Sequence, residues 1–245
     1  METMKKEFLT VEKFNVISDV FSQAITGELI GMSNFASLAE TIEDPNEKME
    51  AVEHANSERM HAKAFMAYAK ERGFKININL NGQYWGNVRK QFLSYAHKFD
   101  FIACLIIQEV MLETFAISMY TDVGNALGGE AGRLFLRIAE EEREHLEHSS
   151  EFLRNELIED PNAFINKFEE IHFNCMTILS EFSASTDISG HCGVCSGSCM
   201  KLSLHHIGLD IVTIRGNALA LYAQALDEIG IPGEKSIVWI ARLPA

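Results

Sequence analysis

Hydrophobic residues recur along much of this chain at the three- and four-residue spacing that places side chains on one face of a helix. Such stripes lie within residues 11–42, 45–72 and 130–158. The pattern predicts long helices, each with one buried face. The stripe members are Phe14, Ile17, Phe21, Ala24, Gly31, Phe35 and Leu38 in the first, Ala51, Ala55, Phe65 and Tyr68 in the second, and Leu134, Ile138, Ser149 and Phe152 in the third.

Helix-breaking residues set the expected ends of these helices. Asp44-Pro45 separates the first two, Gly73 ends the second, and Asp160-Pro161 begins another. Residues 74–84 contain three Asn and one Gly, so we expect a long connection there rather than a strand. The expected helices span about 11–42, 45–72, 86–97, 101–120, 130–158, 161 onward and 200–229, and a short tail follows Pro232.

The segment 101–120, FIACLIIQEVMLETFAISMY, contains no basic side chain, and its only charged residues are Glu109 and Glu113. Its length would suit a membrane span, but two carboxylates near its centre would each be costly in lipid. We therefore expect a helix buried in protein, with no stable membrane insertion.

Four of the predicted helices carry Glu or Glu-x-x-His on their buried stripes. Residues three apart project from one face, so each Glu-x-x-His presents a carboxylate and an imidazole together. An unpaired buried carboxylate costs several kcal/mol, and these stripes hold no Lys or Arg to pair with it. The pattern thus predicts two metal ions in the core of a four-helix bundle, with the ligands Glu28, Glu58, His61, Glu113, Glu142 and His145.

Several other polar residues receive weaker expectations. Glu169 and His172 also form a Glu-x-x-His, but Glu169 lies about 100° round the helix from its stripe, so we expect a pair at the rim. His54, one turn before Glu58, is expected next to the ligands, whereas His148 is expected at the surface. Tyr120 is a candidate radical or hydrogen-bonding residue, or a buried tyrosine whose hydroxyl has a partner.

Composition agrees with an all-α protein of this kind. The chain has 245 residues, of which 47% are hydrophobic, and no low-complexity linker divides it. We expect a single domain, 1–245, with a ferritin-like four-helix bundle and additional helices.

The formal charge of −14 argues against nucleic acid and anionic membranes as partners, since both select basic patches. The N-terminal residues lack the apolar core of a secretory signal, so we expect a cytoplasmic protein. In a reducing compartment its five cysteines would be thiols or metal ligands.

Around the six predicted metal ligands, the chain resembles the cyanobacterial aldehyde-deformylating oxygenases. The closest stretch is 104–120, CLIIQEVMLETFAISMY, which is similar in its apolar positions, in Gln108 and in Glu113. Gly27-Glu28, Glu58-Arg59-Met60-His61, Glu142-Arg143-Glu144-His145 and the segment 225–230, ALDEIG, also resemble that family, and the resemblance covers most of residues 14–240.

The resemblance implies a function. The six predicted ligands would hold two iron ions, with manganese as an alternative, and Glu58 and Glu113 would bridge them. O2 would be the co-substrate, and an apolar pocket beside the metals would take a long-chain aldehyde. An external donor such as ferredoxin and its reductase would supply electrons, and the products would be an alkane and formate.

Glu109 departs from the family, which has a small apolar residue there. It lies one turn before Glu113 on the same predicted stripe. It could ligate a metal, hydrogen-bond to a ligand, or remain a neutral buried acid. Any of these puts the substrate and reaction outcome in doubt more than the metals.

The second departure is the cysteine-rich segment 189–200, SGHCGVCSGSCM, where the family has a shorter polar connection. Four interpretations stay open: a structural zinc or other metal site, a redox dithiol, an iron–sulfur cluster, or a passive loop. The ligand-type residues are His191, Cys192, Cys195, Cys199 and His205.

Two other functions remain open for the whole chain. One is a di-iron oxygenase or oxidase of the same fold acting on another small metabolite, such as an amine that becomes N-oxygenated. The other is a non-enzymatic role in handling iron or peroxide. The resemblance favours the aldehyde-deformylating reaction over both.

Overall fold

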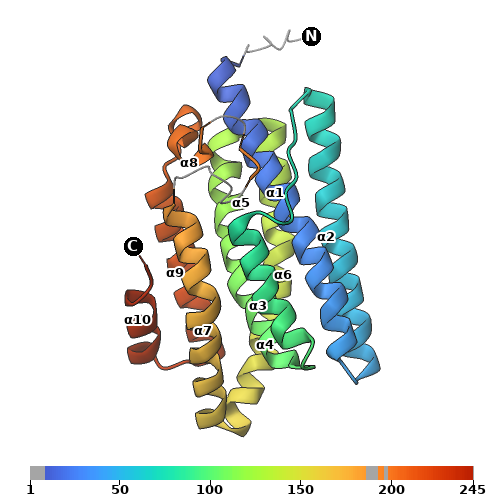
Figure 1. Cartoon of the computed structure of the whole chain (residues 1–245), viewed down its shortest axis with the longest axis vertical. Helices are drawn as coiled ribbons and strands as arrows, with labels where there is room; N and C mark the ends of the chain where they lie inside the picture. The colour runs from blue at the N-terminus through green and yellow to red at the C-terminus, as the bar shows by residue number, and fades with distance from the viewer. Residues whose placement is uncertain (1–8, 186–192, 196–197, 245) are drawn as a thin grey trace.

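Long helices packed side by side form the body of the protein in the computed structural model, which describes residues 9–185, 193–195 and 198–244 (Figure 1). α1 (Val11–Leu38) packs mainly against α2 (Pro45–Arg72), and α5 (Glu113–Leu127) packs mainly against α6 (Gly129–Glu159). Every regular element among the described residues is helical, which confirms the predicted all-α class.

The helix ends follow the local signals in the sequence. The Asp44 carboxylate caps α2 by accepting hydrogen bonds from the N–H groups of Asn46 and Glu47, and Gly73 ends it with a left-handed φ of 74°. α1 is shorter than predicted, because the chain tightens after Leu38 into a 3-10 turn, η1 (Ala39–Thr41). Both ends of α2 were predicted correctly.

Residues 74–82 form no helix or strand and lead from α2 to α3 (Gln83–Ala96), as Figure 1 shows. The backbone N–H of Asn77 donates to Ser22 Oγ at 3.0 Å, and the Asn77 side chain donates to the carbonyl of Val194 at 3.3 Å. Such bonds replace the backbone partners that a strand would have supplied. The predicted long connection is confirmed.

The central apolar helix is not one α-helix. α4 (Phe101–Leu105) passes into a π-helix, η2 (Ile106–Leu112), and then into α5. Within the described residues, only the run Phe101–Leu127 is long and apolar enough to cross a membrane, and 72% of its most apolar window is buried inside the protein. Its apolar character is therefore explained by burial among the other helices.

The prediction of one long helix over 200–229 was wrong. The chain forms α8 (Met200–Ser203) and a 3-10 turn, η3 (Leu204–Ile207), and breaks at Gly208, whose φ is 78°. α9 (Ile211–Ile229) then begins at Asp210, whose side chain accepts the N–H of Thr213. A left-handed glycine followed by a capping aspartate ends one helix and starts another.

The prediction of a short tail after Pro232 was also wrong, because Pro232 begins α10 (Gly233–Ala241). Proline suits a helix start as well as a helix end, since its fixed φ matches the first turn. α10 buries Trp239 against α7 (Pro161–Ala184), where its ring stacks on Phe168.

His172 is completely buried, whereas the sequence predicted it at the rim. Its Nδ1 lies 2.9 Å from the Tyr222 hydroxyl, and its ring stacks on Tyr222. Burial lowers the pKa of His172 to about 4. It is an uncharged histidine of the core, bonded through Nδ1, while its Nε2 is buried without a hydrogen-bond partner.

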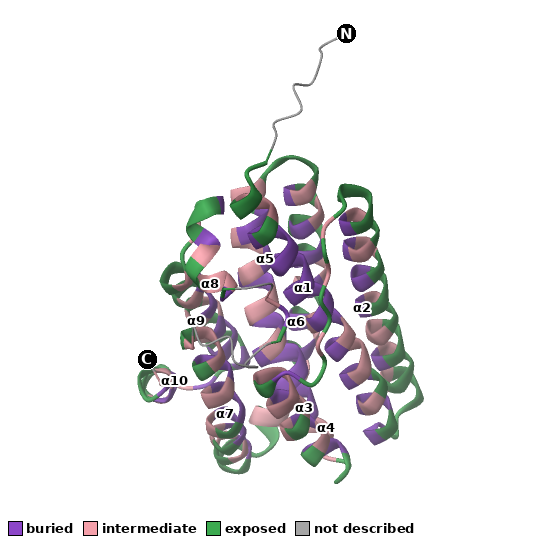
Figure 2. Ribbon diagram, turned by 45° about the horizontal axis from the view of Figure 1, so that its top comes forward, coloured by how far each residue is buried: buried purple, intermediate pink, exposed green. Residues whose placement is uncertain are grey.

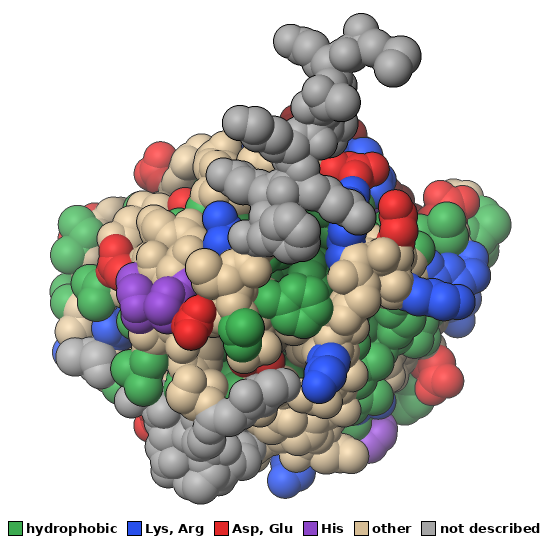
Figure 3. All heavy atoms as spheres, turned by 90° about the horizontal axis from the view of Figure 1, so that it is seen from above, with side chains coloured by type: hydrophobic (Ala, Val, Ile, Leu, Met, Phe, Trp, Pro, Cys, Tyr) green, Lys and Arg blue, Asp and Glu red, His purple; other side chains and the backbone are tan. Residues whose placement is uncertain are grey.

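Two hydrophobic clusters fill the bundle. One surrounds Phe21, Phe65 and Phe135, and the other includes Phe35 and Leu146. Along both α1 and α6, the predicted ligands Glu28 and Glu142 fall between members of the two clusters. Figure 2 shows buried residues turned inward and exposed residues on the outer faces of the helices. On the face drawn in Figure 3, acidic and basic side chains are interspersed among the described residues.

Candidate metal centre

The structure brings all six predicted ligands together from four helical elements. Each is at least 93% buried, with exposed fractions between 1% and 7%. Their ligand atoms form two overlapping groups, and within each group they lie within 4.8 Å of one another. The groups are Glu28, Glu58, His61 and Glu142, and Glu58, Glu113, Glu142 and His145.

Glu58 and Glu142 belong to both groups, whereas Glu113 belongs to one. The resemblance implied that Glu58 and Glu113 bridge two metals. This arrangement agrees with a central place for Glu58, and it puts Glu142 rather than Glu113 beside it. The identity of the bridging carboxylates remains a prediction.

His61 joins the two sides of the site. Its Nδ1 lies 2.9 Å from Glu142 Oε1 and 3.2 Å from Glu28 Oε2, and its Nε2 lies 2.7 Å from Glu141 Oε2. A carboxylate on the outer nitrogen of a metal-binding histidine fixes the ring and its tautomer. We did not single out Glu141 from the sequence; its signal was an Arg137 four residues earlier, which holds its other oxygen at 2.6 Å.

Gln108 and Asn34 form a second support that the sequence analysis did not identify. Gln108 Nε2 donates to Glu113 Oε1 at 3.3 Å, and Asn34 Nδ2 donates to Gln108 Oε1 at 2.8 Å. Gln108 and Glu113 are five residues apart, which is the spacing of residues joined by a hydrogen bond in a π-helix. The π-helix therefore places the Gln108 amide within hydrogen-bond distance of the Glu113 carboxylate.

Tyr120 is 2% exposed, and its hydroxyl donates a hydrogen bond to Glu28 Oε1. Burial, followed by the nearby charge of Glu28, raises the pKa of Tyr120 well above its usual value. The hydroxyl therefore stays protonated and acts as a hydrogen-bond donor to a candidate ligand. The hydroxyl is therefore partnered, and a radical role for Tyr120 stays a prediction.

Gly31 makes room for Glu58. A Cβ added at Gly31 would lie 2.8 Å from both Cδ and Oε2 of the Glu58 carboxylate, closer than real Cβ contacts come. The Glu58 carboxylate therefore occupies space that a side chain at residue 31 would fill.

The buried carboxylates raise one another's proton affinity. Burial, followed by the charge of Glu142, raises the pKa of Glu28, Glu58 and Glu113, the last two well above the ordinary value. Burial acts against a charged His61, but its hydrogen bonds to Glu142 and Glu28 raise its pKa to about 11. Burial alone would raise the pKa of Glu142, yet the nearby imidazoles of His145 and His61 lower it to about 2.

The donor set fits divalent metal ions. Among the described residues, the ion pairs of these carboxylates are with His61 and His145, so one histidinium is the main internal counter-charge for four carboxylates. His145 Nδ1 and Glu142 Oε2 are 3.1 Å apart, yet neither atom has an aligned hydrogen-bond partner. Two buried ligand-type atoms without partners, among carboxylates and imidazoles, match the needs of iron or manganese.

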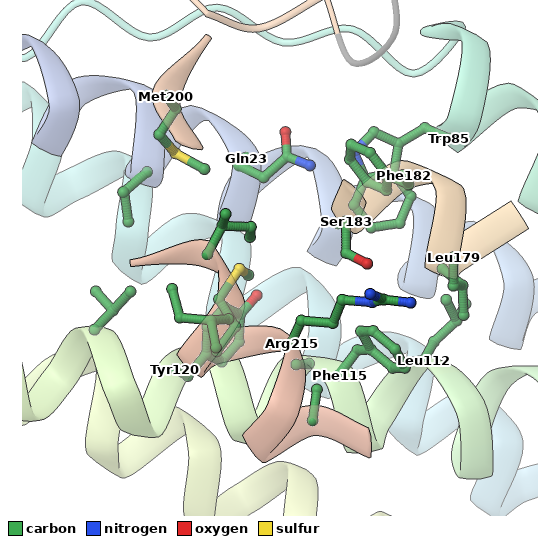
Figure 4. Close-up of a pocket in the computed structure, with 18 of the residues that line it drawn as sticks. Gln23, Trp85, Leu112, Phe115, Tyr120, Leu179, Phe182, Ser183, Met200 and Arg215 are labelled. Carbon is green, nitrogen blue, oxygen red and sulfur yellow. The ribbon is translucent and has the colours of Figure 1, made fainter. Parts of the chain in front are cut away.

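A cavity of about 160 Å³ opens from this centre, and its wall includes Glu28, Glu58, Glu113 and Glu142. Most other wall residues are apolar, from α1, α5, α7 and α9. Figure 4 shows Gln23, Ser183 and Arg215 reaching toward the same space from different helices. The cavity thus connects the candidate metal centre to an apolar chamber with a few polar groups.

Glu109 is 3% exposed but belongs to neither group of core ligands. Its Oε1 lies 3.6 Å from His54 Nδ1. Residues four apart share a face in an α-helix, but Glu109 lies in the wider turn of the π-helix η2, and it is not grouped with Glu113.

Only part of the cysteine-rich segment is described. Cys199 is buried, Cys195 is half-buried, and both line the wall of the 160 Å³ cavity. His205 is exposed, and its Nδ1 lies 3.0 Å from the carbonyl of Leu202. His191 and Cys192 lie outside the described residues, so the predicted zinc or redox site stays a prediction.

Comparisons with known proteins agree with this geometry. Residues 12–177 match a family described as long-chain fatty aldehyde decarbonylase. A solved structure of a Synechococcus protein described as having aldehyde deformylating oxidase activity is similar, with a TM-score of 0.78 and 19% identity. The match covers 96% of this chain and 99% of that chain. It confirms the predicted ferritin-like fold.

Proposed function

Because this chain belongs to the long-chain fatty aldehyde decarbonylase family, we propose that it is an O2-dependent, non-haem di-iron oxygenase that deformylates a long-chain aldehyde. The products are formate and a hydrocarbon one carbon shorter. Electrons come from an external donor such as ferredoxin with its reductase. The reaction needs no serine or cysteine nucleophile.

The observation that carries this proposal is that four buried carboxylates form part of the wall of an apolar cavity. Glu28, Glu58, His61, Glu113, Glu142 and His145 would hold two metal ions. Iron(II) bound there would supply the reducing power that activates O2. The cavity would accept an aldehyde with its carbonyl end toward these ligands and its chain among apolar side chains.

The surrounding residues orient the ligands. The Tyr120 hydroxyl holds Glu28, the Asn34–Gln108 pair holds Glu113, and Glu141 holds the outer nitrogen of His61. Each bond restricts a carboxylate or imidazole to one orientation. Leu112, Phe115 and Met119 are among the cavity wall residues that exclude water beside the centre.

The test is product analysis after reconstitution with iron(II). Long-chain aldehyde, a reducing system and O2 should give equal amounts of formate and the shortened hydrocarbon, and labelled O2 should place one labelled oxygen in the formate. The Glu113→Ala variant should give neither product, because it lacks a ligand. Consumption of O2 by the loaded protein without either product would exclude the aldehyde as substrate.

A specific observation also supports the second candidate, oxygenation of a small metabolite such as an amine. Gln23 Oε1 and Arg215 Nε are buried atoms of cavity-wall residues without hydrogen-bond partners. An acceptor and a donor of this kind suit a substrate that carries a second polar group. The variant Gln23→Leu separates the two. It should leave an apolar aldehyde's KM nearly unchanged and raise that of an amine.

A further inference from the structure

A second cluster of ligand-type side chains lies beside the core centre, on the side of α2 and α6. Glu50, His54 and His148 each offer a ligand atom, and these three atoms lie within 4.8 Å of one another. His148 Nε2 is 3.5 Å from Glu50 Oε1. None of these three residues belongs to either group of core ligands.

Glu109, in the π-helix η2, lies beside this cluster. Its Oε1 lies 3.6 Å from His54 Nδ1, and it lines the same small cavity as the other three residues. The Glu109 side chain is 3% exposed, and its Oε2 has no hydrogen-bond partner. His54 Nδ1 and His148 Nδ1 are also buried without a hydrogen-bond partner.

The negative charge of the side chains around this small cavity favours binding of a cation. Its wall contains the carboxylates of Glu47, Glu50 and Glu109 and no Lys or Arg. A buried carboxylate with an unpaired oxygen is costly unless a cation or a donor faces it. The cavity, of about 10 Å³, has room for a single ion or water.

The four side chains form a graded path from solvent inward. Glu50 and His148 are 41% and 37% exposed, His54 is 12% exposed, and Glu109 is 3% exposed. The His54 ring stacks on the ring of the core ligand His145, with centroids 4.2 Å apart. The cluster therefore reaches from the surface to the edge of the core centre without containing its ligands.

We propose that Glu50, His54, Glu109 and His148 bind a third divalent transition-metal ion. Two imidazoles and two carboxylates form a donor set suited to manganese, iron or zinc, and the two negative charges balance the ion. Glu109 serves this site rather than the core centre, which explains how an extra buried carboxylate is accommodated. The proposal does not depend on which substrate the core centre uses.

The test is a titration of metal-free, full-length protein with Mn²⁺, in which free Mn²⁺ is followed by electron paramagnetic resonance. Mn²⁺ is the suitable probe because carboxylates and imidazoles bind it, whereas thiolates of the cysteine-rich segment favour softer ions. The double variant Glu50→Gln, His148→Asn should bind one ion fewer per chain than the wild type. Both residues are partly exposed, so the variant should keep its fold.

Two further variants sharpen the result. Glu109→Gln keeps the shape of the side chain and removes its charge, and it should weaken binding of the third ion at least tenfold. His97→Asn changes an exposed histidine outside the cluster and should bind as many ions as the wild type. Circular dichroism should show native helix content in all of these variants.

The difference of one ion is the readout, whatever number the core centre holds. The core variant Glu113→Ala should lose core ions and keep the third, so failure of the core assignment and failure of this proposal are distinguishable. Equal numbers of ions in the wild type and the double variant would overturn the proposal. A loss in His97→Asn as large as in the double variant would also overturn it, since binding would then be a property of surface histidines.

Discussion

At the scale of single residues, the candidate metal centre depends on small and polar side chains as much as on the ligands. Gly31 leaves the space that the Glu58 carboxylate occupies. Gln108 supports Glu113 and in turn accepts a hydrogen bond from Asn34. Together these residues hold the buried ligand side chains in one orientation, which the ligands alone would not do.

Gly31→Ala should lower metal affinity without unfolding the protein. Alanine favours a helix by about 1 kcal/mol over glycine, but its Cβ would displace the Glu58 carboxylate. The metal content after dialysis should therefore fall while helix content is preserved. Gly216→Ala is the matched control, because nothing lies within 4 Å of its added Cβ, and it should retain all metal. Full metal occupancy in Gly31→Ala would show that Glu58 is not held where we place it.

At the scale of elements, sequence patterns predicted the helices whose ends carry local signals. Asp44-Pro45 and Gly73 bound α2 as expected, and Asp160-Pro161 starts α7. The six ligands could also be found, because each lies on an apolar stripe where an unpaired charge would be costly.

Other elements could not be read from the sequence, for physical reasons. Apart from Gln108 and Glu109, η2 is apolar, so its pattern contains no period that separates a π-helix from an α-helix. Glu109 is buried as predicted, but the sequence could not show that it lies beside His54 rather than in a core group. The break at Gly208 and the start of α10 at Pro232 depend on backbone signals that both end and begin helices.

α10 should contribute to stability without contributing to metal binding. Trp239 is 1% exposed and packs against Phe168 and His172. Trp239→Ala should therefore destabilise the protein by about 3–5 kcal/mol, measured by urea denaturation, with unchanged metal content in the folded protein. Ile237→Ala, on the same helix and 70% exposed, should change stability little. Loss of metal from folded Trp239→Ala would mean that α10 also shapes the core centre.

At the scale of the whole molecule, the bundle holds a charged layer between two hydrophobic clusters. The metal-free protein must keep protons on that layer, because burial raises the pKa of Glu28, Glu58 and Glu113. Metal ions would replace those protons, so folding, metal binding and pH are linked.

Metal-free protein should lose stability as pH rises. A group whose pKa is higher in the folded state stabilises the fold fully at pH values below its unfolded-state pKa. That stabilisation is lost as the pH rises toward the folded-state pKa, which for the three carboxyls begins at pH 4.5. It applies to His61 between pH 6.5 and about 11. The lowered pKa of Glu142, about 2, acts only below pH 4.5. The Tm difference between metal-loaded and metal-free protein should therefore widen from pH 6 to pH 9, and a constant difference would contradict this linkage.

The central claim is that these six residues hold two neighbouring metal ions. X-ray absorption of the iron-loaded Glu50→Gln, His148→Asn variant, which lacks the proposed third site, tests it most directly. The spectrum should show iron bound by nitrogen and oxygen, with a second iron about 3.5–4 Å away and about two irons per chain. Adding Glu113→Ala should remove the iron–iron signal. A spectrum of isolated iron, or an iron–iron signal that survives the loss of Glu113, would contradict the account.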